Sequence, residues 1–167
     1  VSWIVLWMLS TRLGATIIVT ANTEQQLRSR TWAELGKWMT LSINSHWFHK
    51  TATTIKPAPW FQEALERDLK IDTGYYYAQA QLWSEENPDA FAGIHSSYGV
   101  CLIMDEASGI PSPIYSVSEG FFTEPTQNRY WFTFSNPRRN TGPFYDSFNS
   151  KKKFWQNLQI DSRTVEG

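Results

Sequence analysis

Residues 100–106 read Val-Cys-Leu-Ile-Met-Asp-Glu, five apolar side chains followed directly by two carboxylates. A strand that is apolar on every side is typical of a parallel sheet that helices cover on both faces. A second apolar run, at residues 130–134, reads Tyr-Trp-Phe-Thr-Phe and ends in Ser-Asn-Pro. The two runs predict neighbouring parallel strands at the centre of one sheet.

Predicted helices and strands alternate along the rest of the chain. Thr23 can cap a helix over residues 24–39, and Pro59 can open a helix that ends at Leu69. The other predicted elements are an opening helix that ends at Leu13-Gly14, strands at 15–20, 41–48, 75–83 and 154–160, a polar connection at 50–58, and short helices near Asn87-Pro88 and at 144–148. This alternation predicts an α/β domain with a mostly parallel sheet and helices on both faces.

Composition restricts the classes of protein that the chain can represent. With 167 residues it has the size of one domain, and a formal net charge of −1 gives no global attraction to nucleic acid or lipid. The single cysteine, Cys101, excludes a disulfide framework and a cysteine-ligated zinc site, and favours a reducing compartment. Nine Trp, ten Phe and seven Tyr suit either a large core or a stacking surface.

The first nine residues are apolar on nearly every side. They are far fewer than the ~20 that span a bilayer, and no basic residue precedes them, so neither a membrane segment nor a secretory signal is predicted. A helix that is apolar all round predicts burial, which places Trp3 and Trp7 in the core. The run has no cap and no initiator Met, and residues 164–167 give no stop signal, so we expect a piece of a longer protein.

Polar side chains follow three of the predicted strands: Asp105-Glu106, Ser135-Asn136 and Asn22-Thr23. Ligands of parallel α/β sheets bind at the carboxyl ends of the strands. Of two adjacent carboxylates, one can hold magnesium and the other can deprotonate water. Taken singly, each ending is also explained as a solvated strand end or an ordinary turn. Three such endings at one edge favour a cleft.

Together these blocks resemble the ATPase domain of the terminase large subunit, the DNA-packaging motor of tailed bacteriophages and prophages. Residues 100–107 resemble its Walker B strand, and residues 133–137 followed by 142–145 resemble its coupling motif and the segment beyond it. Residues 20–27 and 32–35 resemble its second strand–helix unit. The resemblance covers almost the whole chain in order, and it implies a P-loop NTPase-like fold.

The resemblance also implies roles for the matching positions. Asp105 would hold the magnesium of Mg-ATP, and Glu106 would be the catalytic base. Ser135 and Asn136 would couple the state of the γ-phosphate to movement, while Asn22 and Thr23 would contribute to the nucleotide cleft. An arginine finger cannot be assigned, because the stretch before the Walker B strand contains His95 and no Arg.

Two parts of the family pattern are missing from residues 1–167. The sequence contains no G-x-x-x-x-G-K motif followed by Ser or Thr, so we expect the phosphate-binding (Walker A) loop just before Val1. A nuclease domain is expected after Gly167. The chain is therefore expected to be a partial ATPase domain, which alone neither hydrolyses ATP nor binds it tightly.

The family implies double-stranded viral DNA, a small terminase subunit, a portal protein and further copies in a ring as partners, in the host bacterial cytoplasm. Arg28, Arg30, Arg138 and Arg139 are the candidate contacts to DNA, although solvated surface charges are common. Arg138 and Arg139 could instead stabilise charge on a neighbour's nucleotide. A solvated surface is also the simpler explanation of the lysine run at residues 151–153 and of the His46/His49 pair.

Two other functions remain open from the sequence. A different P-loop translocase or helicase would have a similar Walker B pair. A non-catalytic, aromatic-rich binding or assembly module predicts tryptophan side chains exposed on one face, whereas an enzyme domain predicts them buried.

Overall fold

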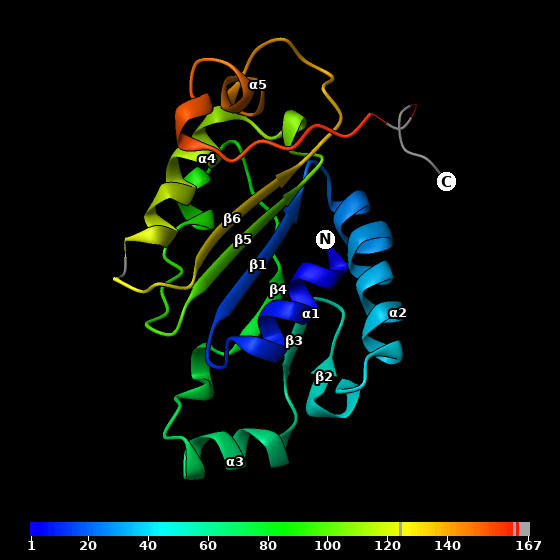
Figure 1. The fold of residues 1–167 in the computed structure, drawn as a ribbon, viewed down its shortest axis with the longest axis vertical. Helices are drawn as coiled ribbons and strands as arrows, with labels where there is room; N and C mark the ends of the chain where they lie inside the picture. Colours follow the sequence, from blue (N-terminus) through cyan, green and yellow to red (C-terminus); the bar gives the residue numbers. More distant parts are fainter. Residues whose placement is uncertain (124, 162, 164–167) are drawn as a thin grey trace.

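A six-stranded sheet forms the centre of the molecule (Figure 1), with the strand order β2-β3-β4-β1-β5-β6. The computed structural model describes residues 1–123, 125–161 and 163, so residues 164–167 lie outside the described part. The strands are β1 (Thr16–Ala21), β2 (Phe48–Lys50), β3 (Thr54–Pro57), β4 (Tyr77–Ala80), β5 (Val100–Asp105) and β6 (Arg129–Phe134). The strands β4, β1, β5 and β6 are parallel, and β3 pairs antiparallel with both β2 and β4, which confirms a mostly parallel sheet.

The two apolar runs of the sequence are neighbouring parallel strands, as predicted. Their place in the sheet differs from the prediction, because β6 lies at the edge and β1 and β5 lie inside. All six residues of β1 are buried, and so are the first five of β5, whereas β6 is half-buried to exposed. The apolar composition of β6 therefore predicted that it is a strand, but it did not predict that β6 lies at the edge of the sheet.

Helices cover both faces of the sheet (Figure 1). The helices α1 (Ser2–Thr11) and α2 (Ala33–Leu41) cover one face, together with a π-helix, η1 (Gln26–Trp32). The helices α4 (Ser112–Ser118) and α5 (Pro143–Phe148) lie on the other face. Successive residues of β1 point into the two cores, with Val19 in the first and Ile18 in the second. The sheet is thus the middle layer of three.

The remaining helices are short or peripheral. The helix α3 (Pro59–Asp68) lies beyond β3 at one end of the molecule (Figure 1). The single-turn 3-10 helices are η2 (Ser45–Trp47), η3 (Thr73–Tyr75), η4 (Pro88–Phe91), η5 (Ala107–Gly109), η6 (Glu119–Phe122) and η7 (Lys152–Phe154). Within the described ranges, no helix is both long and apolar enough to cross a membrane.

Several predicted elements are confirmed and two are wrong. The helices predicted to begin at Pro59 and to cover 144–148 are present, and the Thr23 hydroxyl accepts the N–H of Gln26 at 3.2 Å as a helix cap. The predicted strand at 41–48 is instead the end of α2, a turn and η2, with Ile43 96% exposed, and its last residue, Phe48, begins β2. The predicted strand at 154–160 has no regular structure after η7. Most apolar residues of the two stretches face solvent, namely Leu41, Ile43, Phe154, Leu158 and Ile160, so their pattern does not report a buried strand.

Two elements were missed by the sequence analysis. The polar connection at 50–58 contains β3, whose Ile55 is buried against Ala78 of β4. The helix α4 gave no clear signal, because Pro111 and Pro113 flank its first residue. Short elements whose stability comes from tertiary packing are weakly marked in the sequence.

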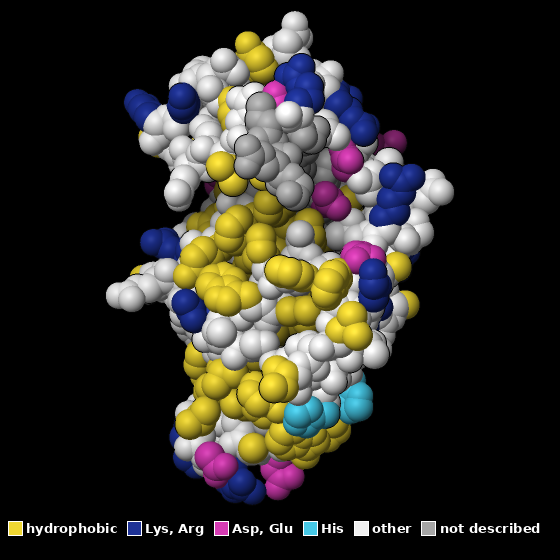
Figure 2. All heavy atoms as spheres, turned by 45° about the vertical axis from the view of Figure 1, so that its right-hand side comes forward, with side chains coloured by type: hydrophobic (Ala, Val, Ile, Leu, Met, Phe, Trp, Pro, Cys, Tyr) yellow, Lys and Arg dark blue, Asp and Glu magenta, His cyan; other side chains and the backbone are white. Residues whose placement is uncertain are grey.

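The opening helix buries only one side. Val5, Met8 and Leu9 are fully buried, but Trp3 is 68% exposed and Trp7 is 38% exposed, so the prediction that both tryptophans lie in the core is wrong. The Trp7 ring lies edge-on to Tyr130 of β6, with 5.3 Å between ring centroids. Figure 2 shows hydrophobic side chains over much of the face that carries this helix.

Gly14 connects α1 to β1 in a conformation that favours glycine, with φ +85°. A Cβ atom there would lie 2.5 Å from the Tyr98 ring. We therefore expect Gly14→Ala to lower the free energy of unfolding by about 1–3 kcal/mol, measured by urea denaturation. Gly120→Ala is the matched control, because a Cβ at Gly120 meets no atom within 4 Å. Equal midpoints for the two variants would contradict the prediction.

Candidate active site

The carboxyl ends of β1, β5 and β6 are level with one another. Ala21 and Phe134 both pair with Asp105 in the register of the sheet. The first residue after β1 is Asn22, the first after β5 is Glu106 and the first after β6 is Ser135. The polar groups that were predicted to lie at one edge of the sheet therefore lie there.

Both oxygens of the Asp105 carboxylate accept hydrogen bonds. The Thr31 hydroxyl donates to Oδ2 at 2.6 Å, and the backbone N–H of Glu106 donates to Oδ1 at 3.1 Å. Thr31 is buried, whereas Asp105 is half-buried. Two donors on different elements therefore fix the orientation of this carboxylate.

Glu106 adopts a left-handed backbone conformation, with φ 51° and ψ 42°. This conformation costs a residue other than glycine about 1–3 kcal/mol, and such residues cluster at active sites. Its side chain is 23% exposed, and Oε2 lies 3.7 Å from Nη2 of Arg138. The carboxylate can therefore meet water at the sheet edge while it contacts a guanidinium group.

Ser135 joins the segment after β6 to the segment after β5. Its Oγ lies 2.7 Å from Oγ of Ser108, a residue of η5, and 3.0 Å from the backbone oxygen of Asn136. Asn136 itself is exposed. The two segments that carry the proposed coupling and Walker B residues are thus in direct contact.

The predicted pair Asn22 and Thr23 have different surroundings. The Asn22 side chain lies against Gly109 of η5, where a Cβ atom would come within 2.4 Å of its Cγ. The Thr23 hydroxyl caps η1, as described above. Asn22 therefore faces the segment that follows Glu106, while Thr23 stabilises the helix that carries Thr31.

The four candidate arginines lie on two elements. Arg28 and Arg30 are exposed on η1, and Arg28 forms an ion pair with Glu24 at 2.7 Å. Arg138 and Arg139 are exposed in the loop after β6. Arg138 contacts Glu106, so the structure places it at the candidate site rather than on a separate basic surface.

Sequence reasoning missed four residues of this region. Thr31 lies 74 positions from Asp105, and neither Ser108 nor Gly109 belongs to a recognisable motif. Trp83 was also missed, and its indole N–H donates to the backbone oxygen of Ala21 at 2.9 Å. No spacing in the sequence could have shown these contacts, because each joins segments that are distant along the chain.

The donor set fits a magnesium–nucleotide complex rather than a metal site made by protein alone. Among the described residues, no group of three or more His, Cys, Asp or Glu side chains could hold a metal ion. Magnesium typically takes one or two carboxylates, keeps several waters and binds the substrate phosphates. Asp105 and Glu106 can supply those carboxylates. In the described part of the chain, the His46 ring does not join a group of metal ligands but stacks on the Trp60 ring, with ring centroids 6.0 Å apart.

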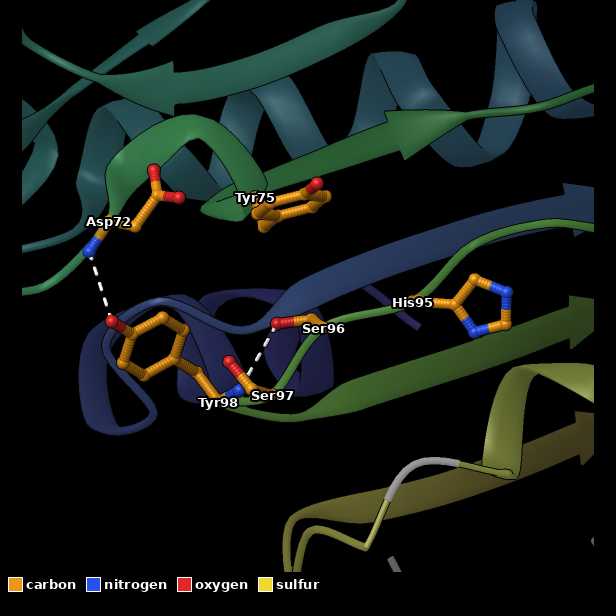
Figure 3. A pocket seen from close by; sticks show the side chains of 6 residues that line it. All are labelled: Asp72, Tyr75, His95, Ser96, Ser97 and Tyr98. Atoms are coloured by element: carbon orange, nitrogen blue, oxygen red, sulfur yellow. Dashed lines mark hydrogen bonds between the residues drawn. The ribbon is translucent and has the colours of Figure 1, made fainter.

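A cavity of about 360 Å³ lies at the opposite end of the sheet, at the amino ends of β4 and β5 (Figure 3). In it the Tyr98 hydroxyl accepts the N–H of Asp72 at 3.0 Å, and the His95 ring points away from these two residues. A second, largely apolar groove of about 730 Å³ runs along β6. Neither contains the Asp105–Glu106 pair.

The buried cysteine takes no part in the site. Burial raises the pKa of the Cys101 thiol to about 12, so the thiol stays protonated near neutral pH. Cys101 is therefore an unreactive thiol of the core.

The mostly parallel sheet, covered on both faces, with an Asp-Glu pair at its carboxyl edge, is an α/β fold of the P-loop NTPase-like type. The structure is similar to that of the large terminase of a thermophilic bacteriophage, solved in complex with ADP, with a TM-score of 0.56. The match covers 92% of this chain and 33% of that chain, at 14% sequence identity, and shows the shared fold.

The sequence is similar to a probable terminase large subunit from Enterobacteria phage P7. The two are 29% identical over 142 residues, which cover 80% of this chain. The chain spans 25% of the length of that relative. No protein-family model matches the sequence. The resemblance to the terminase large subunit is thus confirmed by one comparison of sequence and one of structure.

Proposed function

We propose that residues 1–167 are part of the ATPase of a terminase large subunit, the motor that drives double-stranded viral DNA into a procapsid. The observation that carries the proposal is the Asp105–Glu106 pair at the end of β5, level with the end of β6. It occurs in a chain that is similar to a large terminase in sequence and to another in fold.

In this proposal Glu106 is the catalytic base. Its carboxylate, 23% exposed, accepts a proton from the water that attacks the γ-phosphate in line. Asp105 is the magnesium anchor, held in place by its two hydrogen-bond donors. When bound, magnesium supplies neutralisation of the charge that develops on the phosphate oxygens.

Ser135, Asn136 and Arg138 would connect hydrolysis to movement. Ser135 contacts Ser108, two residues beyond Glu106, and Arg138 contacts Glu106 itself. A shift of the loop after β6 would therefore reach the base through two contacts. Asn136 is exposed at the same edge and is available to a nucleotide, whereas Asn22 is half-buried against Gly109.

The phosphate-binding loop and the nuclease domain are assigned by this proposal to sequence before Val1 and after Gly167. Arg28, Arg30, Arg138 and Arg139 are all exposed and are the proposed contacts with DNA, and Arg138 also contacts Glu106. The proposed partners are viral DNA, a small terminase subunit, a portal protein and further copies of the chain, in the host bacterial cytoplasm.

The exposure of the tryptophans does not favour the binding-module alternative. Trp32 is buried and five other tryptophans are half-buried, while Trp3, Trp7 and Trp60 are exposed. Of the exposed tryptophans, Trp3 and Trp7 belong to α1 and Trp60 belongs to α3, so they do not come from a single element.

The test is ATP hydrolysis by the full reading frame that contains these residues, with and without double-stranded DNA, followed by packaging into procapsids. We expect hydrolysis that depends on magnesium and that packages DNA when procapsids are added. Strand separation without packaging would indicate a helicase. Absence of ATP hydrolysis under all conditions would contradict the proposal.

A further inference from the structure

We propose that Thr31 is a positioning residue for magnesium, because its hydroxyl orients the Asp105 carboxylate. The inference rests on the proposed function, since it assigns a supporting residue to the same site. Nothing in the family pattern described above includes Thr31, which precedes the block at residues 32–35.

The contact between Thr31 and Asp105 has the geometry of a strong hydrogen bond. The distance from the hydroxyl oxygen to Oδ2 is 2.6 Å, which is typical of a hydroxyl that donates to a charged carboxylate. Thr31 is only 6% exposed, so water competes little for this bond. Because each carboxylate oxygen can accept two hydrogen bonds, Asp105 keeps acceptor capacity for a metal ion or its waters.

The local helix geometry explains how Thr31 comes to face β5. Thr31 belongs to the π-helix η1, and π-helical turns are rare and frequently occur at functional sites. Leu27 and Trp32, five positions apart, are both buried, which matches the i→i+5 bonding of a π-helix. The Trp32 indole N–H also donates to the backbone oxygen of Thr51 at 3.2 Å. Trp32 thus anchors η1 and holds the neighbouring Thr31 against the sheet.

Residues that hydrogen-bond a metal-ligating carboxylate contribute strongly to metal binding. Loss of such a partner typically weakens metal affinity or activity about 10–100-fold. Thr31 fits this role because its hydroxyl fixes one carboxylate oxygen while the Glu106 N–H fixes the other. Without the hydroxyl, the carboxylate can rotate about its last side-chain bond.

Thr20 provides a matched comparison at the same edge of the sheet. It is fully buried in β1, one residue before the position level with Asp105. Its hydroxyl has no hydrogen-bond partner within the described part of the chain. Replacing Thr20 by Val therefore removes the same group as replacing Thr31 by Val, but no contact with Asp105.

The experiment measures Mn²⁺ binding by electron paramagnetic resonance, in the full reading frame with a non-hydrolysable ATP analogue. We expect Thr31→Val to weaken Mn²⁺ binding about 10-fold or more, Thr31→Ser to restore it, and Thr20→Val to leave it unchanged. The Mg²⁺ concentration for half-maximal hydrolysis should rise by the same factor in Thr31→Val, with turnover recovering at saturating Mg²⁺. A purely structural role would not move this midpoint.

Asp105→Asn separates failure of this inference from failure of the proposed function. If Asp105→Asn leaves Mn²⁺ affinity unchanged, the magnesium site itself is misplaced. If Asp105→Asn weakens binding and Thr31→Val does not, the role of Thr31 is refuted while the proposed function stands. Should Thr31→Val fail to fold, Thr31→Cys gives the same comparison, because a thiol is a weak donor of nearly the same size.

Discussion

Glu106→Gln is expected to lower the ATP turnover of the full reading frame by about 10²–10⁴-fold, which is the usual contribution of a positioned general base. Glutamine keeps the size of the side chain but cannot accept the proton of the attacking water. Asp105 and its two hydrogen bonds do not involve the Glu106 side chain, so nucleotide binding should survive. Single-turnover hydrolysis and calorimetry with Mg-ATP measure the two effects separately.

Glu119→Gln is the matched control for this variant. Glu119 is exposed on η6, and it is not among the residues placed at the candidate site. We expect its turnover to equal that of the unmodified protein. Turnover near that level in Glu106→Gln would refute the assignment of the base and leave the fold assignment untouched.

Residues 1–167 alone are expected to fold but to bind Mg-ATP far more weakly than micromolar, with no hydrolysis. Most of the nucleotide affinity in this fold comes from the N–H groups of the phosphate loop, the helix behind it and its lysine. That motif does not occur in residues 1–167. The carboxylates of Asp105 and Glu106 repel a triphosphate when no cation lies between them.

Calorimetry of the 167-residue chain with Mg-ATP decides this prediction, and far-UV circular dichroism confirms that the chain is folded. The full reading frame, titrated in the same buffer, is the positive control. Micromolar binding by the 167 residues would mean that another part of this chain holds the phosphates.

The strands β5 and β6 were predictable because their sequence signal is local. Five consecutive apolar residues followed by Asp105-Glu106 identify β5, and the next apolar run identifies β6 and its parallel pairing. The order of strands was less accessible, since an edge strand and an inner strand can have the same composition. Ile43 and Leu158 show the converse, because apolar residues that face solvent imitate strands.

Two contacts of the site join distant segments, and the sequence predicted neither these contacts nor the backbone conformation of Glu106. The π-helix turns Thr31 toward Asp105, which no periodicity of 3.6 or 2 indicates. The chain turns back after β6, with the Arg138 N–H bonded to the Asn136 oxygen, and brings the Arg138 guanidinium to Glu106, a contact that the sequence did not predict. The left-handed backbone of Glu106 follows a strand that otherwise looks ordinary.

At Glu106, whose backbone is left-handed, the residue that would give the most stable fold differs from the residue that the proposed hydrolysis needs. Glycine adopts this conformation without steric cost, so it would relax the backbone and make the folded chain more stable. A library sorted only for thermostability would therefore enrich glycine at position 106 and discard the carboxylate. With Glu106 as the proposed base, retention of glutamate there would require selection for hydrolysis, and a thermostable variant of this domain should be designed with position 106 held fixed.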